Sequence, residues 1–425
     1  GRLSDQGVQL ERLLLRGLSF SVEGFGTGDA EAKLQLLRAW LRLVQGSAAL
    51  QKLMLEELGV GERADNLAGA RRELCTLIEG PWPALTELSL CGCNKALGLV
   101  RGVFHGPLHA QLRRLDLSSC GLIAPDAATM ATAMRNMQRL EALLLSGNGI
   151  GPRGAIQLCP GLCSVAGTLR ELDLSSNGLG SEGLQILLEP LRLLQQLQVL
   201  RLRGNWASDS GGAEVLLEVM RTTGPRLQEL DLSQNRLGAT SFRQLLAGLP
   251  LLPELQQLCL AENCFATSDL VAGGARAPSF GLLRENAPAL KVLDLSGIGL
   301  GSDEFALRAI ISSLPRGLEK LLLQASKLQL LQLKALLEVM PLLPDLQHLI
   351  LVQAQMDDRA ADLLSELAFQ LPRLQVLDIR GNRISGEAAA ALKQKLQQRP
   401  AFRELRGVKL PPASRDEKRR MLHSG

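Results

Sequence analysis

The sequence predicts an α/β solenoid, in which strand–helix units repeat and each unit packs only against its neighbours. Two observations predict it. A motif of the form L-x-x-L-x-L recurs at nearly constant spacing, and more than a fifth of the 425 residues are leucine while aromatic residues make up only 3%. A core built almost entirely from one aliphatic residue is typical of stacked repeats, which escape the size limit of a single globular core.

The motif occurs thirteen times, and its copies begin at Leu10, Leu50, Leu85, Leu112, Leu140, Leu169, Leu197, Leu227, Leu255, Leu290, Leu318, Leu346 and Leu374. From Leu112 onward, successive copies are 28, 29, 28, 30, 28, 35, 28, 28 and 28 residues apart, and Phe402 opens a degraded fourteenth copy. Spacing this regular predicts that the units share one backbone path.

The copy that begins at Leu169 indicates why each unit holds one strand and one helix. Leu172 and Leu174 alternate with polar residues, as they do in a strand whose leucines point inward. The residues expected to point outward are Glu171, Asp173 and Ser175. After the turn, from Leu184 to Leu191, the apolar residues follow the i, i+3, i+4, i+7 spacing of a helix.

Three parts of the chain are expected from the repeat spacing. Residues 1–111 hold divergent N-terminal repeats with insertions, residues 112–400 hold regular repeats of 28–30 residues with an insertion at about 264–289, and residues 401–425 hold a terminal cap and a basic tail. Insertions leave a stack as loops on one rim, where they are either functional or merely tolerated. The insertions lie at 23–29, 62–72 and 265–279.

The most regular copies are Leu169-Arg-Glu-Leu-Asp-Leu-Ser-Ser-Asn-Gly-Leu-Gly and Leu227-Gln-Glu-Leu-Asp-Leu-Ser-Gln-Asn-Arg-Leu-Gly. They resemble leucine-rich repeats of the ribonuclease-inhibitor subtype, the helix-containing kind that Ran GTPase-activating proteins and NLR-type proteins also carry. The resemblance covers nearly the whole chain. It implies a right-handed horseshoe of about 13 repeats, with a parallel sheet on the concave face and helices on the convex face.

The ninth position of the motif is expected to form a ladder of side chains inside the turns. A buried amide there can bond the backbone groups that the turn exposes, and the resemblance implies that Cys93 and Cys120 can replace it. The asparagines at this position are Asn148, Asn177, Asn205, Asn235, Asn263 and Asn382. Five units have a residue at this position that cannot form these bonds, namely Leu18, Leu58, Ile298, Ser326 and Ala354. Local irregularity is therefore expected at the N-terminal end and between Ile298 and Ala354.

Bulk properties argue against several classes of protein. A net charge of +4 and a pI near 8.7 are too mild to predict nucleic-acid binding from charge alone. No apolar run reaches the roughly 18 residues that a membrane span needs, and the charged first 18 residues do not read as a signal peptide. Because the sequence begins at Gly1 and not at a methionine, removal of a targeting peptide stays an open alternative.

The eight cysteines favour reduced thiols, because some fall at positions that face the core. A reducing, intracellular location is therefore expected. The cytoplasm, including its cytoskeletal assemblies, is the first choice, and an organelle is the alternative if the N-terminus is processed.

No motif predicts catalysis, a cofactor or a metal. His105 and His109 have the i, i+4 spacing of a metal pair, but the Gly-Pro between them argues against the helix that would align them. The pairs Cys91/Cys93 and Cys159/Cys163 lack the paired spacing of structural zinc, and no phosphate-binding G-x-x-x-x-G-K-[ST] pattern is present. We therefore predict a protein that is not an enzyme.

The outward strand positions offer one patterned surface, a discontinuous stripe of aspartates on the expected concave face. It either docks a basic segment or reflects how common Leu-Asp-Leu-Ser is in this repeat type. Trp206 is expected either to anchor an interface or to pack on the loop at 208–212, and the basic tail is either solvated or bound to a partner or to RNA phosphates. The candidate partner-binding residues are Asp116, Asp173, Asp231, Asp294, Asp378, Arg201, Arg203, Trp206, Arg380, Arg415, Lys418, Arg419 and Arg420.

These patterns favour a non-catalytic protein–protein interaction scaffold, a structural or accessory subunit of a larger assembly, which contacts proteins through the concave face or rim. A Ran-type GTPase-activating protein is an alternative from the resemblance, although the tail is basic where that family's tail is acidic, and no catalytic residue can be mapped. A protein subunit of an RNA-containing particle, such as an organellar ribosome, is another alternative, in which the tail contacts RNA phosphates. No membrane insertion is expected.

Overall fold

The computed structural model describes residues 11–16, 19–20, 35, 38–39, 41–42, 49–56, 59–60, 75–76, 78–93, 99–105, 107–206, 209–223, 225–264, 281–299 and 304–407. The predicted insertions at 23–29, 62–72 and 265–279, the positions Leu18 and Leu58, and the tail with Arg415, Lys418, Arg419 and Arg420 lie outside these residues. The chain forms two compact units. Unit 1 is Gly1–Ala207 with Arg221–Leu227, and unit 2 is Ser208–Met220 with Gln228–Gly425.

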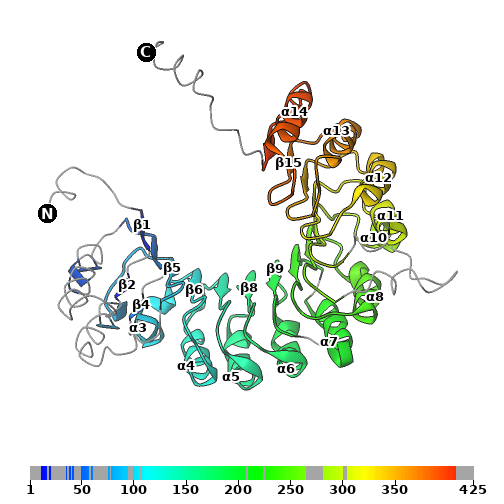
Figure 1. The fold of residues 1–425 in the computed structure, drawn as a ribbon. Helices are drawn as coiled ribbons and strands as arrows, with labels where there is room; N and C mark the ends of the chain where they lie inside the picture. Colours follow the sequence, from blue (N-terminus) through cyan, green and yellow to red (C-terminus); the bar gives the residue numbers. More distant parts are fainter. Residues whose placement is uncertain are drawn as a thin grey trace, which may run out of the picture. The chain divides into compact units, whose positions relative to one another are not determined.

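Unit 1 alternates short strands with helices, and its strands pair in parallel in the order of the sequence. Its main sheet holds β1 (Arg12–Arg16), β3 (Lys52–Glu56), β5 (Glu87–Ser89), β6 (Arg114–Asp116), β7 (Ala142–Leu144), β8 (Glu171–Asp173) and β9 (Val199–Arg201). A second parallel pair is β2 (Ser19–Phe20) with β4 (Gly59–Val60). The helices are α3 (Leu99–His105), η3 (Pro107–Ala110), α4 (Ala124–Met134), α5 (Gly151–Ser164) and α6 (Gly180–Leu193), and α4 to α6 lie side by side along one side of the strands (Figure 1).

Unit 2 repeats the pattern, with helices α11 to α14 side by side (Figure 1). Its strands are β10 (Glu229–Asp231), β11 (Gln257–Cys259), β12 (Val292–Asp294), β13 (Lys320–Leu322), β14 (His348–Ile350), β15 (Val376–Asp378) and β16 (Glu404–Arg406). Its helices are α7 (Asp209–Thr222), whose last two residues belong to unit 1, α8 (Ala239–Gly248), η4 (Leu249–Leu251), α10 (Gly281–Asn286), α11 (Glu304–Ser312), α12 (Leu330–Val339), η7 (Met340–Leu342), α13 (Ala360–Gln370) and α14 (Gly386–Leu396).

The predicted α/β solenoid is confirmed. Fourteen parallel strands of the described residues follow one another in sequence order, and β16 is the strand of the degraded fourteenth copy. Adjacent strands pair without stagger, so that Lys320 pairs with His348 and His348 with Val376, each 28 residues on. A parallel sheet needs a crossover between strands, and the helix of each unit supplies it.

The core consists of the predicted leucine rows. Leu172 and Leu174 are at most 1% exposed, whereas Glu171 and Asp173 are half-buried, as expected for inward and outward positions of a strand. The expectation for Ser175 is wrong, because this side chain is only 6% exposed. The strand ends at Asp173, so the alternation of inward and outward positions ends before Ser175, which lies in the following turn.

The predicted ladder of amides forms inside the turns. The Oδ1 atom of Asn148 accepts hydrogen bonds from the backbone N–H groups of Cys120 (3.0 Å) and Leu122 (2.9 Å) in the preceding unit. Its Nδ2 atom donates to the carbonyl of Leu117 at 3.0 Å and to that of Leu145 at 2.7 Å. One buried amide therefore bonds four backbone groups, and the carbonyl of Leu145 also accepts from Asn177 of the next unit at 2.9 Å, which links successive amides into the ladder.

Cysteine replaces asparagine where the resemblance implied it. The Cys93 thiol donates to the carbonyl of Leu55 at 2.9 Å, and the Cys120 thiol donates to that of Leu90 at 3.0 Å. Burial raises the pKa of Cys120, which keeps this thiol protonated and able to donate. All eight cysteines are free thiols in the structure.

Between Ile298 and Ala354 the amide ladder is interrupted, but the described turns at Ala325 and Gln353 keep the regular backbone conformation. Ala325 and Gln353 have φ of 53°, the same left-handed conformation as Ser119 at 54°. The backbone N–H of Ala325 donates to the carbonyl of Val352 at 2.9 Å, as that of Ser119 does to Ser146 at 2.7 Å. Hydrogen bonds between the backbones of adjacent turns therefore maintain the turn conformation in units whose ninth-position side chain cannot form the amide bonds.

Within the residues that the structure describes, no helix is both long and apolar enough to cross a bilayer.

Candidate binding surface on the strands

The candidate site is the outward side of the strands, which we call the strand face. It is formed by the first and third residues of the three-residue strands, whose side chains are mostly half-buried while the middle leucine is buried. Alternation along a strand places these side chains together on one surface, and the register between strands stacks them into rows. The strand face of each unit is therefore a broad surface of positioned side chains.

In unit 1 this surface centres on Glu171 of β8. Its carboxylate accepts hydrogen bonds from Arg114 of β6 and from Arg201 of β9, the latter at 2.6 Å. Arg114 pairs in register with Ala142 of β7, and Ala142 pairs with Glu171, so Arg114 reaches across a whole strand. The methyl side chain of Ala142 leaves the room that this bridge requires.

The three side chains hold one another in place. Burial by itself raises the pKa of Glu171, but the hydrogen bonds from Arg114 and Arg201 outweigh burial and hold that pKa below its usual value. The exposed fraction of the side chain is 41% for Arg114, 26% for Arg201 and 19% for Glu171. The carboxylate is thus charged and partly covered, while both guanidinium groups still reach the solvent.

A hollow of about 310 Å³ lies next to this bridge, at the N-terminal ends of the strands β5 to β9 of unit 1. Arg113 and Glu141 form an ion pair on its wall, and Arg170 is an exposed cation beside them. The lining residues are Glu87, Arg113, Arg114, Glu141, Ala142, Arg170, Glu171, Gln198 and Val199. Because its charges pair on an exposed surface, the hollow lacks the shielding that acid–base catalysis requires.

The predicted aspartate stripe has a structural task. Each of Asp116, Asp173, Asp231 and Asp294 accepts a hydrogen bond at 2.9 Å from the backbone N–H two residues further along the chain. These carboxylates therefore close the turn that follows their own strand. In register, Leu144 stands between Asp116 and Asp173, and Arg201 stands beside Asp173, so the acidic positions are separated by other side chains.

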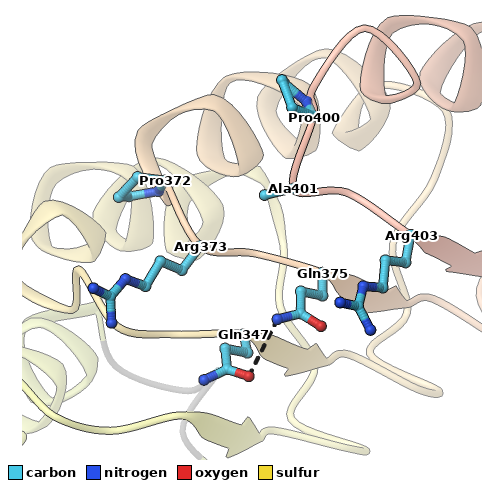
Figure 2. Close-up of a pocket in the computed structure, with 7 residues that line it drawn as sticks. All are labelled: Gln347, Pro372, Arg373, Gln375, Pro400, Ala401 and Arg403. Atoms are coloured by element: carbon cyan, nitrogen blue, oxygen red, sulfur yellow. Dashed lines mark hydrogen bonds between the residues drawn. The ribbon is translucent and has the colours of Figure 1, made fainter.

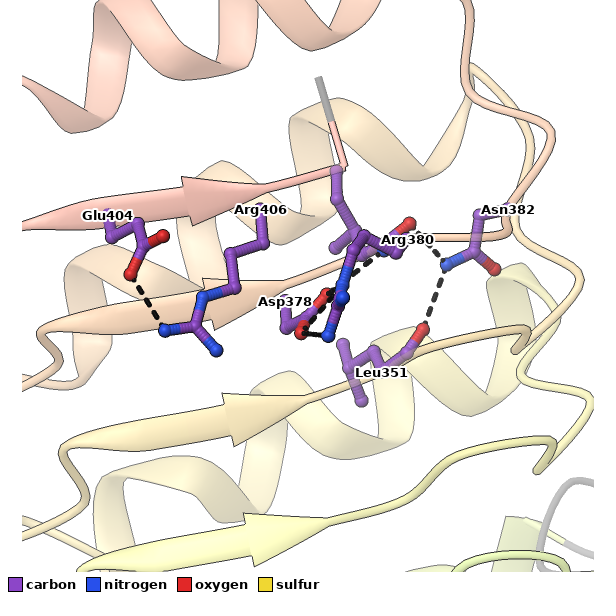
Figure 3. Close-up of polar contacts among 7 residues, drawn as sticks. Leu351, Asp378, Arg380, Asn382, Glu404 and Arg406 are labelled. Carbon is purple, nitrogen blue, oxygen red and sulfur yellow. Dashed lines mark hydrogen bonds and ion pairs between the residues drawn. The ribbon is translucent and has the colours of Figure 1, made fainter. Parts of the chain in front are cut away.

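Asp378 of β15 differs from the other aspartates, because it is only 1% exposed. The guanidinium of Arg380 donates to both of its oxygens, from Nε at 3.0 Å and from Nη2 at 2.7 Å (Figure 3). Next to this pair, Arg406 of β16 donates to Glu404 at 2.9 Å. Sequence analysis placed Asp378 on an exposed stripe, and the structure instead covers it with Arg380.

The remaining predicted residues lie at the end of unit 1. Arg203 follows β9 and is half-buried, and Trp206 is 58% exposed with φ of 57°. Trp206 was expected to pack on the loop at 208–212, and the side chains of that loop lie outside the described residues. Exposure of an indole ring at a turn is compatible with the anchor role, which stays a prediction.

Unit 2 has a hollow of about 280 Å³ at the corresponding end of β14 to β16 (Figure 2). Gln375 Nε2 donates to Gln347 Oε1 at 3.3 Å, and Arg373 pairs with Asp345 at 2.8 Å. Arg403 completes its polar wall. Sequence reasoning missed this hollow, because glutamine at the same motif position also occurs at Gln198, Gln228 and Gln256 and does not single out these two units.

The described residues contain no group of three or more side chains arranged to hold a metal ion. The charged and polar side chains of the strand face can pair charges and form hydrogen bonds with another molecule over several strands.

Comparison with known families agrees with this architecture. A model described as "Leucine Rich repeat" matches residues 137–159, 168–187 and 371–393, and a second, described as "Leucine Rich Repeat", matches residues 289–315. These matches fall in both units.

Two curated relatives match through their repeats. The human protein "NACHT, LRR and PYD domains-containing protein 5" is 32% identical over 228 residues, which are 52% of this chain and 18% of that protein. The pig "Ribonuclease inhibitor" is 30% identical over 219 residues, 45% of this chain and 46% of that protein. The chain thus spans less than half the length of each of these relatives.

Among solved structures, a TLR13–ssRNA13 complex matches with a TM-score of 0.46 and 19% identity, covering 86% of this chain and 44% of that chain. A likeness at this level carries no argument about function. The identification rests instead on the repeated motif, the strand–helix units and the family matches. The chain is a leucine-rich repeat protein with repeats of the ribonuclease-inhibitor and NLR type.

Proposed function

We propose that this chain is a non-catalytic scaffold that binds a partner protein on the strand face of unit 1. The observation that carries the proposal is the bridge of Arg114, Glu171 and Arg201, whose charged groups are fixed by one another and still reach solvent. Side chains that are already ordered lose less conformational entropy when a partner binds. Arginine is also among the residues that most often dominate the binding energy of interfaces.

The repeat architecture supports the same function. Leucine-rich repeat domains typically bind proteins, and a long row of stacked units presents more positioned side chains than a globular domain of the same size. The bridge spans β6 to β9, so a partner that contacts both arginines crosses four strands, a distance on the order of 15 Å.

The alternatives receive no such support. A Ran-type GTPase-activating protein rests on family resemblance, and a subunit of an RNA-containing particle rests on the tail at 415–420, which lies outside the described residues. No contact among the described residues favours either of them.

The test compares what copurifies with the tagged full chain from its native source, analysed by mass spectrometry with and without nuclease. Wild type is compared with the double variant Arg114→Ala/Arg201→Ala. The matched control is Arg135→Ala/Arg192→Ala, which removes two arginines from the end of α4 and from α6 in the same unit.

We expect a stoichiometric protein partner that is retained by the control and reduced at least tenfold by the strand-face variant. Equal recovery with both variants would place the interface elsewhere and contradict the proposal. Loss of the partner after nuclease treatment would instead support the RNA-particle alternative.

A further inference from the structure

Helix α12 starts with a pair of leucines that its counterparts lack. The two residues at this place are Leu330 and Leu331, whereas the other units of similar spacing have small or polar residues there. The corresponding pairs are Ser181-Glu182, Ala239-Thr240, Asp358-Arg359 and Gly386-Glu387. Leu331 is 56% exposed, so its presence is not explained by the core of unit 2.

These leucines border a hollow of about 500 Å³, which we call the Leu331 hollow. It lies between the first turn of α12 and the turns that follow β14 and β15, all within unit 2. Leu331 and the half-buried Leu330 provide the accessible apolar surface, and Met356, which is only 1% exposed, packs beneath it. Ligand sites of this size combine apolar lining with a few polar groups that orient the ligand.

The polar part of the Leu331 hollow carries excess positive charge. Arg359 pairs with Asp357 at 3.3 Å, which offsets its charge. Arg383 is exposed, and among the residues described its side chain has no ion-pair partner. Its backbone N–H donates to the carbonyl of Met356 at 2.8 Å, and this bond fixes Arg383 beside the apolar surface.

From this arrangement we propose that the Leu331 hollow binds a linear segment of a partner protein in which one or two large apolar side chains are flanked by carboxylates. The apolar part of the segment would remove water from Leu330 and Leu331, and a flanking carboxylate would pair with Arg383 in a charge-assisted hydrogen bond. The surface differs from the strand face of unit 1. The proposal therefore does not depend on the function proposed above.

The segment's chemistry follows from the two halves of the site. Apolar surface alone would accept any hydrophobic residue, and a cation alone would accept any acid. Because both line one hollow, they select a segment that offers both, since a partner that satisfies only one half leaves the other half exposed or unpaired.

The test uses the full chain and three fluorescein-labelled octapeptides, with binding measured by fluorescence anisotropy. The first peptide has a central Phe-Leu flanked by three acidic residues on each side. The second keeps Phe-Leu and replaces the acids by lysine, and the third keeps the acids and replaces Phe-Leu by Ala-Ala. We expect the first peptide to bind at least tenfold more tightly than either of the others.

Two variants separate the halves of the site. Leu331→Asp should weaken the first peptide at least tenfold, and Arg383→Glu should weaken it and strengthen the lysine peptide. Leu193→Asp is the matched control, because Leu193 is 53% exposed at the end of α6 in unit 1, and it should bind like wild type. Thermal unfolding of all three variants checks that each one folds.

The proposal is overturned if the first peptide does not bind, if the three peptides bind equally, or if Leu331→Asp and Arg383→Glu both behave like the control. Both substituted side chains are exposed, so their loss leaves the leucine core intact.

Discussion

Arg380 covers Asp378 through hydrogen bonds to both carboxylate oxygens, at 3.0 and 2.7 Å, although the two residues are only two positions apart. At the same place in other units, the aspartate relies on a backbone N–H and stays half-buried. Asp378 also accepts the backbone N–H of Arg380 at 3.2 Å, so it closes its turn as the other aspartates do, and the Arg380 side chain adds a cover over its carboxylate. The acid sensitivity of unit 2 follows from this pair.

The first prediction concerns this acid sensitivity. Burial raises the pKa of Asp378, but hydrogen bonds from Arg380 outweigh burial and hold it below its usual value. Because the folded pKa lies below the unfolded value of about 3.9, the pair stabilises the fold fully above that pH. This stabilisation is lost as the pH falls through the folded pKa. Arg380→Met should therefore shift acid unfolding, followed by circular dichroism, to a higher pH.

Arg373→Met is the control for this shift, because Arg373 pairs with Asp345 on a more exposed surface, where the exposed fractions are 66% and 37%. An unfolding midpoint that is the same for Arg380→Met and Arg373→Met would contradict the role of Arg380.

A second prediction tests the bridge in unit 1. Glu171→Gln removes the charge that both Arg114 and Arg201 contact, and it should lower the free energy of unfolding at neutral pH by about 1–2 kcal/mol. The pKa of Glu171 is below its usual value, so the stabilisation is present above about pH 4.3, the unfolded pKa, and disappears as the pH falls through the folded pKa. Urea unfolding at several pH values measures this.

The matched control for the bridge is Glu189→Gln. Glu189 pairs with Arg192 at 3.4 Å and is 81% exposed, so its loss should cost less than about 0.5 kcal/mol. If Glu171→Gln has the same small effect at neutral pH, the bridge does not order the strand face.

The third prediction concerns the amide ladder. Asn148→Ala removes the partner of the backbone N–H groups of Cys120 and Leu122 and of the Leu117 carbonyl, whereas the Leu145 carbonyl keeps its bond from Asn177, and the substitution should cost roughly 3 kcal/mol. Ser326→Ala removes one bond, from Oγ to the carbonyl of Gln324 at 3.3 Å, and should cost less than about 1 kcal/mol. Chemical denaturation of both variants compares them. Equal costs would show that the ladder adds no stability.

The fourth prediction follows from the interruption of that ladder. The backbone N–H of Leu237 donates to Asn263 Oδ1 at 3.1 Å, whereas for Leu328 the next unit offers Ala354, which has no side-chain oxygen. Hydrogen exchange of the Leu328 amide should be roughly fivefold faster than that of Leu237, as the loss of about 1 kcal/mol implies. Equal protection would mean that the backbone hydrogen bonds between turns suffice.

A fifth prediction concerns the packing of the helices in unit 1. A Cβ atom on Gly161 of α5 would lie 2.6 Å from the Cα atom of Ala131 in α4 and 2.9 Å from the sulfur of Met134. Gly161→Ala should therefore lower the free energy of unfolding by about 1–3 kcal/mol. Gly167→Ala is the control, because nothing lies within 4 Å of its Cβ position, and it should be neutral or stabilise by up to about 1 kcal/mol.

Much of the fold could be predicted, because the periodicity of leucine is local information. The alternation around Leu172 and the ninth-position amides depend only on a unit and its neighbour, which the spacing of the motif defines. Where the prediction went wrong, at Ser175, the strand ended at Asp173, two residues earlier than the alternation suggested. The regular turns near Ala325 were also missed, since backbone bonds between units cannot be read from side-chain types.

The candidate site was less predictable. Arg114 and Glu171 are 57 positions apart, and they meet only because a strand with a small residue, Ala142, lies between them. The sequence does place Arg114, Ala142 and Glu171 at the same motif position, but this contact can be inferred only by comparing three successive units. The paired leucines at 330 and 331 were visible in the sequence too, yet only the structure places them beside Met356 and Arg383.

The absence of stagger between strands has an evolutionary consequence. Glu229 pairs with Gln257 and Lys320 with His348, in each case 28 positions apart, so a gene that gains or loses one 28-codon segment preserves the pairing of all remaining strands. Loss of a single codon inside a strand would instead turn its leucines toward solvent. Protein length can therefore vary by duplication or deletion of whole units, and each event changes the reach of the strand face by about 4.8 Å.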